Sequence, residues 1–137
     1  ECSPLQAAGE FGRAIIADIC FQQVFIHKPD VEVHKTEVYY FPEETAFYPY
    51  ADCEDLSVFL SWLICRYVTS EVLVLYYPTH VAIAVECFEG REVFKFRNKE
   101  YLICDPSYRG AVPGKIIPAC ASLKPVIVSY SKQKRVK

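Results

Sequence analysis

Three features are missing from this sequence; two of the absences exclude a class of protein, and the third concerns the natural start of the chain. No stretch approaches the roughly 18 consecutive apolar residues of a membrane-spanning helix, so no membrane span is expected. Lysine and arginine number 15 against 17 acidic residues, and the resulting formal charge of -2 provides no basic surface for nucleic acid. Methionine is absent and the chain opens with Glu1, which indicates that the natural start and any targeting signal lie outside these residues. We therefore expect part of a longer protein.

Closely spaced cysteine pairs are also missing, although the chain has seven cysteines. Structural zinc sites favour such pairs, so no metal and no other cofactor is expected. The odd number of cysteines and a chain long enough for a hydrophobic core argue against a disulfide framework. Three cysteines lie in apolar patterns typical of buried free thiols, namely Cys65, Cys87 and Cys104. A bridge between two of Cys2, Cys20 and Cys120 is left open, and Cys53 stands apart from both groups.

What the sequence does contain is enough apolar material for one compact domain, since 52% of its residues are hydrophobic. We expect a single α+β domain over residues 1–137. Apolar periodicity predicts a helix over residues 11–25 and a central helix from residue 53 onward. Runs of β-branched and aromatic residues predict strands at 72–77, 80–87, 93–96, 101–104 and 126–128, with loops at 41–50 and 107–118.

Cys53 is predicted to occupy the first turn of the central helix. Asp52 is a favourable N-cap residue, Asp55 stands where a carboxylate can reach back to the cap, and an apolar stripe follows. A thiol in this position faces unpaired backbone amides and the positive end of the helix dipole, both of which favour the reactive thiolate. Because the neighbouring carboxylates oppose that ionisation, the thiol requires a basic partner such as histidine.

His80 begins one predicted strand, and Asp105 directly follows another. If these strands pair antiparallel with His80 opposite Asp105, the carboxylate orients the imidazole and the other ring nitrogen meets the Cys53 thiol. A simple meander would make the two strands parallel and separate the two side chains. The prediction therefore requires residues 88–97 to form an excursion that leaves the two long strands as partners.

Three short motifs resemble a known family. They are Asp52-Cys53-Glu54-Asp55 at a helix start, His80-Val81-Ala82 at a strand start and Asp105-Pro106 after a tyrosine-bearing strand. Their order is similar to that of the transglutaminase-like domain of the papain-like cysteine enzyme superfamily. The resemblance covers residues 41–128, and uncharacterised bacterial members are similar over the 41–50 stretch and the segment around Tyr108.

The resemblance implies a fold, a set of roles and a location. The fold is papain-like, with a central helix that carries the cysteine at its N-terminus and packs on an antiparallel β-sheet. Cys53, His80 and Asp105 would be the nucleophile, the general base and the orienting acid of a catalytic triad. An exported protein, periplasmic or at the cell surface, is favoured over a cytoplasmic one.

The donor that stabilises the oxyanion is left open. The family's extra donor is usually a tryptophan, glutamine or similar side chain before the cysteine, whereas the single tryptophan, Trp62, lies beyond it. The backbone amide of Cys53 supplies one donor in any case. The candidates for the second donor or for the substrate cleft are Gln22, Gln23, Tyr48, Tyr50 and Tyr108. His27 and His34 are expected to be surface histidines.

These residues predict thiol-dependent acyl transfer by a cysteine peptidase or a transglutaminase-like acyltransferase. Hydrolysis of a peptide or isopeptide bond is the expected outcome, because water is always available and no site for an amine acceptor is recognisable. The expected partner is a peptide or protein substrate. The alternative is a catalytically inactive domain of the same fold that binds a peptide or glycan in an aromatic cleft.

Overall fold

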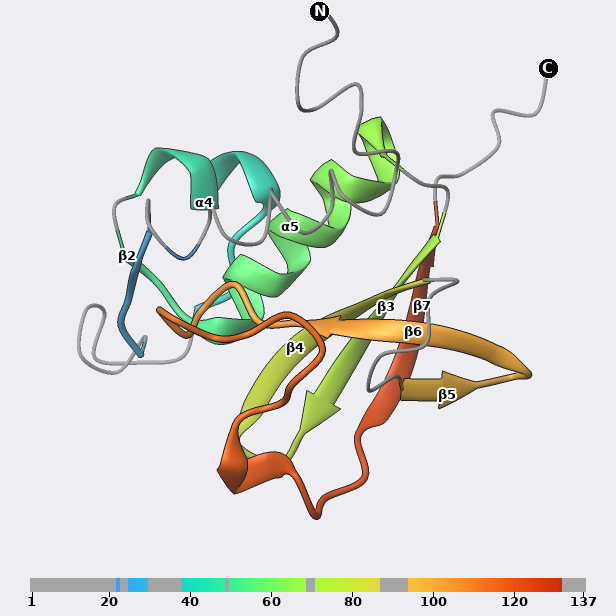
Figure 1. The fold of residues 1–137 in the computed structure, drawn as a ribbon. Coiled ribbons are helices and arrows are strands. Elements are labelled where there is room, and N and C mark those ends of the chain that lie inside the picture. The colour runs from blue at the N-terminus through green and yellow to red at the C-terminus, as the bar shows by residue number, and fades with distance from the viewer. Residues whose placement is uncertain are drawn as a thin grey trace, which may run out of the picture.

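The computed structural model describes residue 22 and residues 25–29, 38–48, 50–68, 71–86 and 94–131. Within these ranges the fold is mixed α+β, as predicted: helix α5 lies across one face of a curled five-stranded antiparallel sheet, and helix α4 packs beside α5 (Figure 1). The helices are α4 (Pro42–Phe47) and α5 (Cys53–Tyr67). The strands of the sheet are β3 (Glu71–Tyr77), β4 (His80–Glu86), β5 (Phe94–Phe96), β6 (Lys99–Cys104) and β7 (Val126–Ser131). Two short parallel strands, β1 (Ile26–His27) and β2 (Tyr50–Ala51), and the 3-10 turn η1 (Pro118–Cys120) complete the described elements.

Helix α5 begins at Cys53, as the sequence predicts. The carboxylate of Asp52 accepts a hydrogen bond from the amide of Asp55 at 2.9 Å, and this N-cap fixes the first turn. The carboxylate of Asp55 is buried and accepts a hydrogen bond from the amide of Tyr40 at 3.0 Å. The helix start is therefore fastened both to its own cap and to the segment that precedes α4.

Along its length α5 buries one face against the sheet. The buried side chains include Leu56, Phe59, Leu60, Ile64 and Cys65, whereas Tyr67, the last residue of the helix, is exposed. A hydrogen bond fixes the position of the helix along β4, since the hydroxyl of Ser57 donates to the carbonyl of Val81 at 3.1 Å. The N-terminal end of α5 is thereby held beside the start of β4.

The segment before α5 contains a helix, so the loop predicted over residues 41–50 is wrong. Pro42 occupies the first position of α4, where the N–H that proline lacks is not needed and its fixed φ suits the helix. The carboxylate of Glu44 accepts a hydrogen bond from the amide of Phe41 at 2.8 Å and completes this start. Tyr48 has an extended backbone, as is favoured before a proline. The prolines delimit the helix and do not prevent it.

The sheet has the order β5-β6-β4-β3-β7, so the two long strands β4 and β6 are antiparallel partners, as predicted. Strand β5 lies in the predicted excursion and pairs on the outer side of β6. The turn between them is built on Arg97 and Asn98, which both have positive φ, as a tight hairpin requires.

The register of β4 and β6 differs from the prediction by two residues. Ile83 lies opposite Cys104, and one further step along the ladder sets Asp105 opposite Ala82 instead of His80. Side chains alternate between faces with a period of two, so a shift of two residues leaves His80 and Asp105 on one face. The two side chains approach each other diagonally.

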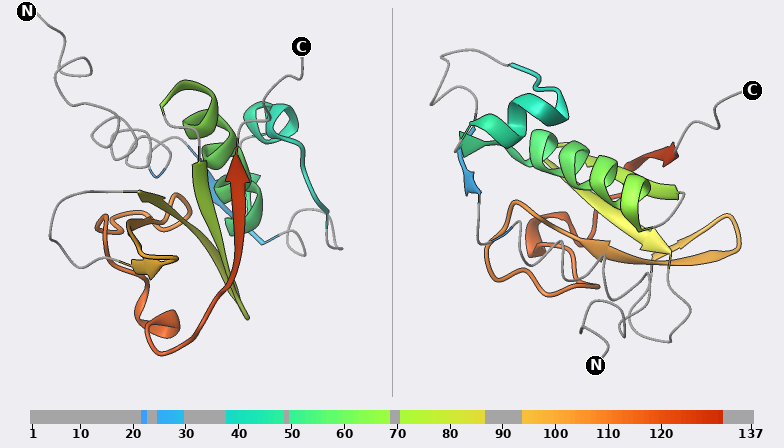
Figure 2. Two further views of the ribbon diagram at one scale, coloured as in Figure 1. Left: turned by 90° about the vertical axis from the view of Figure 1, so that its right-hand side faces the viewer. Right: turned by 90° about the horizontal axis from the view of Figure 1, so that it is seen from above.

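Strands β3 and β4 are buried on both faces, as their nearly continuous apolar sequences predict. Helix α5 covers one face, and the segment between β6 and β7, which includes η1, covers the other (Figure 1, Figure 2). The buried side chains on the second face are Leu73, Leu75, Tyr77, Ala82, Ala84, Tyr101, Ile103 and Cys120. The ends of β4 and β6 that carry His80 and Asp105 are therefore set in a closely packed framework.

Several sequence predictions fall outside the described residues. They include most of the helix over 11–25, together with Cys2, Cys20, Gln23, His34 and Cys87. In the part of the chain that the structure describes, no helix has both the length and the apolar character needed to cross a bilayer.

Candidate active site

The thiol of Cys53 lies partly buried at the N-terminal turn of α5 and has three hydrogen-bond partners. They are the imidazoles of His27 and His80 and the backbone amide of Val81. Burial acts to raise the pKa of the thiol, but these hydrogen bonds and the positive charge of His80 outweigh it and lower the pKa from 9.0 to about 7. A substantial fraction of Cys53 is therefore thiolate at neutral pH.

His80 is held between Cys53 and Asp105. Its Nε2 atom lies 2.5 Å from Oδ2 of Asp105, which leaves Nδ1 for the hydrogen bond to Cys53. Burial acts against the charged imidazole, but the hydrogen bonds to Asp105 and Cys53 and their negative charges raise its pKa from 6.5 to about 9. Between about pH 7 and about pH 9 the pair is thus favoured as thiolate and imidazolium.

Asp105 is 2% exposed, and both of its carboxylate oxygens are engaged. Oδ2 faces His80, while Oδ1 accepts hydrogen bonds from the amide of Ser107 at 3.1 Å and from its hydroxyl at 2.8 Å. The Asp-Pro-Ser turn therefore aims the carboxylate at the imidazole. The three residues that the sequence predicts for the triad, Cys53, His80 and Asp105, lie in one continuous chain of hydrogen bonds.

His27 is the site residue that the sequence analysis missed. It was expected on the surface, and although the residue is exposed, its imidazole also reaches Cys53. Strand β1 pairs in parallel with β2, so that His27 lies beside Ala51, two residues before the thiol. A two-residue pairing between distant segments leaves no periodic pattern, so no local signal marked this histidine.

Gln22, a candidate for the oxyanion donor, is buried and fastens the loop that follows Asp105. Its side-chain Nε2 donates to the carbonyl of Ala111 at 3.2 Å, and its Oε1 accepts from the amide of Gly110 at 3.0 Å. The other amide candidate, Gln23, lies outside the described residues.

The three candidate tyrosines do not converge on Cys53 in one group. Tyr48 stacks on Tyr40 with ring centroids 5.1 Å apart. The ring of Tyr50 lies under the ammonium group of Lys28, which is 4.2 Å from its centroid. Tyr108 is exposed in the loop after Asp105.

The other described cysteines differ from Cys53 in their surroundings. Cys65, Cys104 and Cys120 are buried and form no disulfide, so the bridge left open for Cys120 is not formed to any described cysteine. Burial raises the pKa of Cys65 to about 11 and also raises that of Cys120. Among these thiols, only Cys53 combines partial exposure with a lowered pKa, which is the pattern of a nucleophile.

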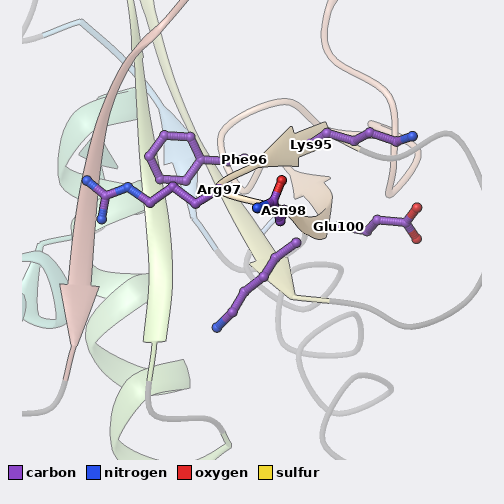
Figure 3. A pocket seen from close by; sticks show the side chains of 6 residues that line it. Lys95, Phe96, Arg97, Asn98 and Glu100 are labelled. Atoms are coloured by element: carbon purple, nitrogen blue, oxygen red, sulfur yellow. The ribbon is translucent and has the colours of Figure 1, made fainter.

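A shallow hollow elsewhere on the surface contains no cysteine or histidine among its lining residues. It is lined by six consecutive residues of the β5–β6 hairpin, Lys95 to Glu100 (Figure 3). The side chains of Lys95 and Arg97 point away from each other in Figure 3, and Lys99 begins β6 at the end opposite to Asp105. The hollow is therefore separate from the cysteine and belongs to the shape of the hairpin.

Comparison with known proteins adds no family to this description, because no family model matches the sequence and no curated protein is significantly similar to it. Among the described residues, no group of three histidine, cysteine, aspartate or glutamate side chains is arranged to hold a metal ion.

Proposed function

We propose that this protein is a thiol-dependent acyl-transfer enzyme, with Cys53 as nucleophile, His80 as general acid and base, and Asp105 as the residue that orients His80. The observation that carries the proposal is the chain of hydrogen bonds from Ser107 through Asp105 and His80 to Cys53. A nucleophile in hydrogen-bond reach of a base that is itself oriented by a third group is the arrangement that activates a thiol.

The proposed reaction proceeds in two stages. The Cys53 thiolate attacks an amide carbonyl, the carbonyl electron pair moves to oxygen, and the backbone amide of Cys53 at the helix terminus donates to that oxyanion. The His80 imidazolium gives its proton to the departing amine as the carbon–nitrogen bond breaks and a thioester remains. His80 then takes a proton from water as the water oxygen attacks the thioester carbonyl, the carbon–sulfur bond breaks, and the acid product leaves with the Cys53 thiolate and the His80 imidazolium restored.

The order and placement of these groups support membership in the transglutaminase-like branch of the papain-like superfamily. A helix with the nucleophile in its first turn packs on an antiparallel sheet, and the strands of that sheet supply the histidine and the acid. On this basis the proposed substrate is a peptide or isopeptide amide, and the proposed outcome is hydrolysis.

A binding domain without turnover is the second candidate, and exposed aromatic side chains around α4 favour it. Tyr39, Phe41 and Phe47 are 70%, 73% and 82% exposed. Rigid rings of this kind contribute large contact areas to peptide or glycan recognition. Such a domain would retain the fold and the aromatic surface but would form no acyl-enzyme.

The two candidates are separated by covalent labelling with an electrophilic peptidyl ketone, read by intact-mass spectrometry. The enzyme is expected to take up one label, on Cys53, within a pH range where an ordinary thiol reacts slowly. Cys53→Ala should remain unlabelled and His80→Ala should react far more slowly, while Lys95→Ala, an exposed substitution in the β5–β6 hairpin, serves as the control. Labelling of Cys53 at the same rate in wild type and His80→Ala would contradict the enzyme and favour the binding domain.

A further inference from the structure

Two imidazoles, and not one, contact the thiol of Cys53. His80 lies at the start of β4, after Cys53 in the sequence. His27 lies in β1, before Cys53 in the sequence. The backbone of β1 is anchored independently of its side chains, because the amide of Lys28 donates to the carbonyl of Ala51 at 3.1 Å. His27 is thus held next to the strand that leads directly into the nucleophile.

The surroundings of the two histidines differ. His80 has a buried carboxylate behind it and only 10% of its side chain exposed, which suits a group that carries charge and relays protons. His27 is exposed, and no carboxylate of the described residues forms an ion pair with it. A second imidazole without an orienting acid does not replace His80, but it brings another ring nitrogen into hydrogen-bond reach of the sulfur.

We infer that His27 is a catalytic donor that holds the Cys53 thiolate before attack and the oxyanion of the tetrahedral adduct after it. This inference rests on the proposed acyl transfer and adds a residue to it. The oxyanion is the oxygen attached to the carbon that has just bonded to the sulfur, so a donor already in hydrogen-bond reach of the sulfur needs only a small movement to reach that oxygen.

The step leaves His27 unchanged in protonation. As the sulfur–carbon bond forms, the sulfur loses its negative charge and its value as an acceptor, while the carbonyl oxygen gains the electron pair. The ring N–H of His27 transfers its hydrogen bond from sulfur to oxygen, next to the backbone amide of Cys53. His80 alone gives a proton to the departing amine, after which the carbonyl re-forms and the oxygen releases both donors.

The test compares His27→Ala with His27→Gln, because a glutamine amide restores an N–H donor without an imidazole. Two quantities are measured: the pH dependence of iodoacetamide alkylation of Cys53, and the rate of acylation by an activated peptide ester. His27→Ala is expected to shift the alkylation midpoint from about 7 toward the ordinary thiol value of 9.0 and to slow acylation by about 10² to 10³-fold. His27→Gln should recover a large part of both losses.

Two results would overturn the inference. One is an alkylation profile and an acylation rate in His27→Ala equal to those of wild type, and the other is a glutamine variant no better than alanine. Equal far-ultraviolet circular dichroism of the variants excludes misfolding as the cause. The same measurements on His80→Ala separate this inference from the proposed function: loss in His80→Ala but not in His27→Ala rejects the donor and keeps the triad, and no loss in His80→Ala rejects the triad itself.

Discussion

The chemistry of the site depends on how the charges of Asp105, His80 and Cys53 stabilise one another. Asp105 is buried with both oxygens engaged, and it stabilises the positive charge of His80, which in turn stabilises the thiolate of Cys53. Each group therefore changes the proton affinity of the next one. The charge on Asp105 acts on the sulfur through the imidazole that lies between them.

Replacing Asp105 by asparagine removes that charge while keeping the size and planarity of the side chain. In Asp105→Asn the pKa of His80 should fall from about 9, the pKa of Cys53 should rise from about 7, and acyl transfer should slow by about 10² to 10⁴-fold. The measurement is the rate of probe labelling across pH. Ser107→Ala is the matched control, since it removes one of two hydrogen bonds to Oδ1 and should slow the reaction much less.

The pH profile of acyl transfer follows from the same two groups. Activity requires the Cys53 thiolate, so it should increase as pH rises through about 7, and it requires the His80 imidazolium, so it should decrease as pH rises through about 9. The expected kcat/KM profile is a bell with its plateau between these values, both of which belong to the coupled pair. A profile that rises through pH 9 without a second limb would contradict the proposed role of His80.

At the scale of residues, the sequence predicts the position of a side chain where its neighbours in the chain form a recognisable pattern. Asp52 before an apolar helix marked Cys53, and Pro106 after a strand marked Asp105. His27 had no such context, because its position depends on a parallel pairing with residues far along the chain. Contacts created by tertiary structure alone are beyond what local patterns predict.

At the scale of elements, the start of α5 determines where the thiol lies. The Asp52 cap and the Asp55 contact to Tyr40 both fix the first turn, whose amides face the site. The helix terminus is thus rigid before any substrate arrives.

Loss of the cap should lower both the stability of the protein and the reactivity of Cys53. Asp52→Ala removes the acceptor for the Asp55 amide and should lower the free energy of unfolding by about 1 kcal/mol, with slower labelling of Cys53 because the first turn frays. Urea denaturation and probe labelling measure the two effects. Asp52→Asn keeps an acceptor of similar capping strength and should restore most of the stability; an asparagine variant as unstable as alanine would contradict the capping role.

Element boundaries were predicted better than strand register. The central helix and the five strands of the sheet lie close to their predicted ranges, since each has either an apolar period or a short apolar run bounded by turn residues. The register of β4 and β6 was wrong by two residues, because apolar runs buried on both faces do not distinguish between shifts of two. The loop predicted over residues 41–50 contains the helix α4, because a proline such as Pro42 in the first turn favours a helix start.

At the scale of the whole molecule, the site lies where three layers meet: α5, the sheet and the segment after β6. Gln22 connects a distant part of the chain to that segment through Gly110 and Ala111, five and six residues after Asp105. The loop that carries the acid is therefore held from outside the sheet.

Removing this connection should loosen the loop without disturbing the sheet. Gln22→Ala leaves the amide of Gly110 and the carbonyl of Ala111 without their side-chain partner, which should cost about 1 to 3 kcal/mol of stability and increase amide exchange around Gly110. Hydrogen exchange read by mass spectrometry is the measurement. Lys115→Ala, an exposed change in the same loop, is the control. Unchanged exchange at Gly110 in Gln22→Ala would show that the loop is held by other contacts.

The central claim is that Cys53 is ionised by its neighbours at neutral pH. The ultraviolet absorbance of the thiolate, taken as the difference between wild type and Cys53→Ala during a pH titration, measures this directly and needs no substrate. The expected result is a midpoint near 7 for Cys53. A midpoint near 9.0, the value of an ordinary thiol, would contradict the account.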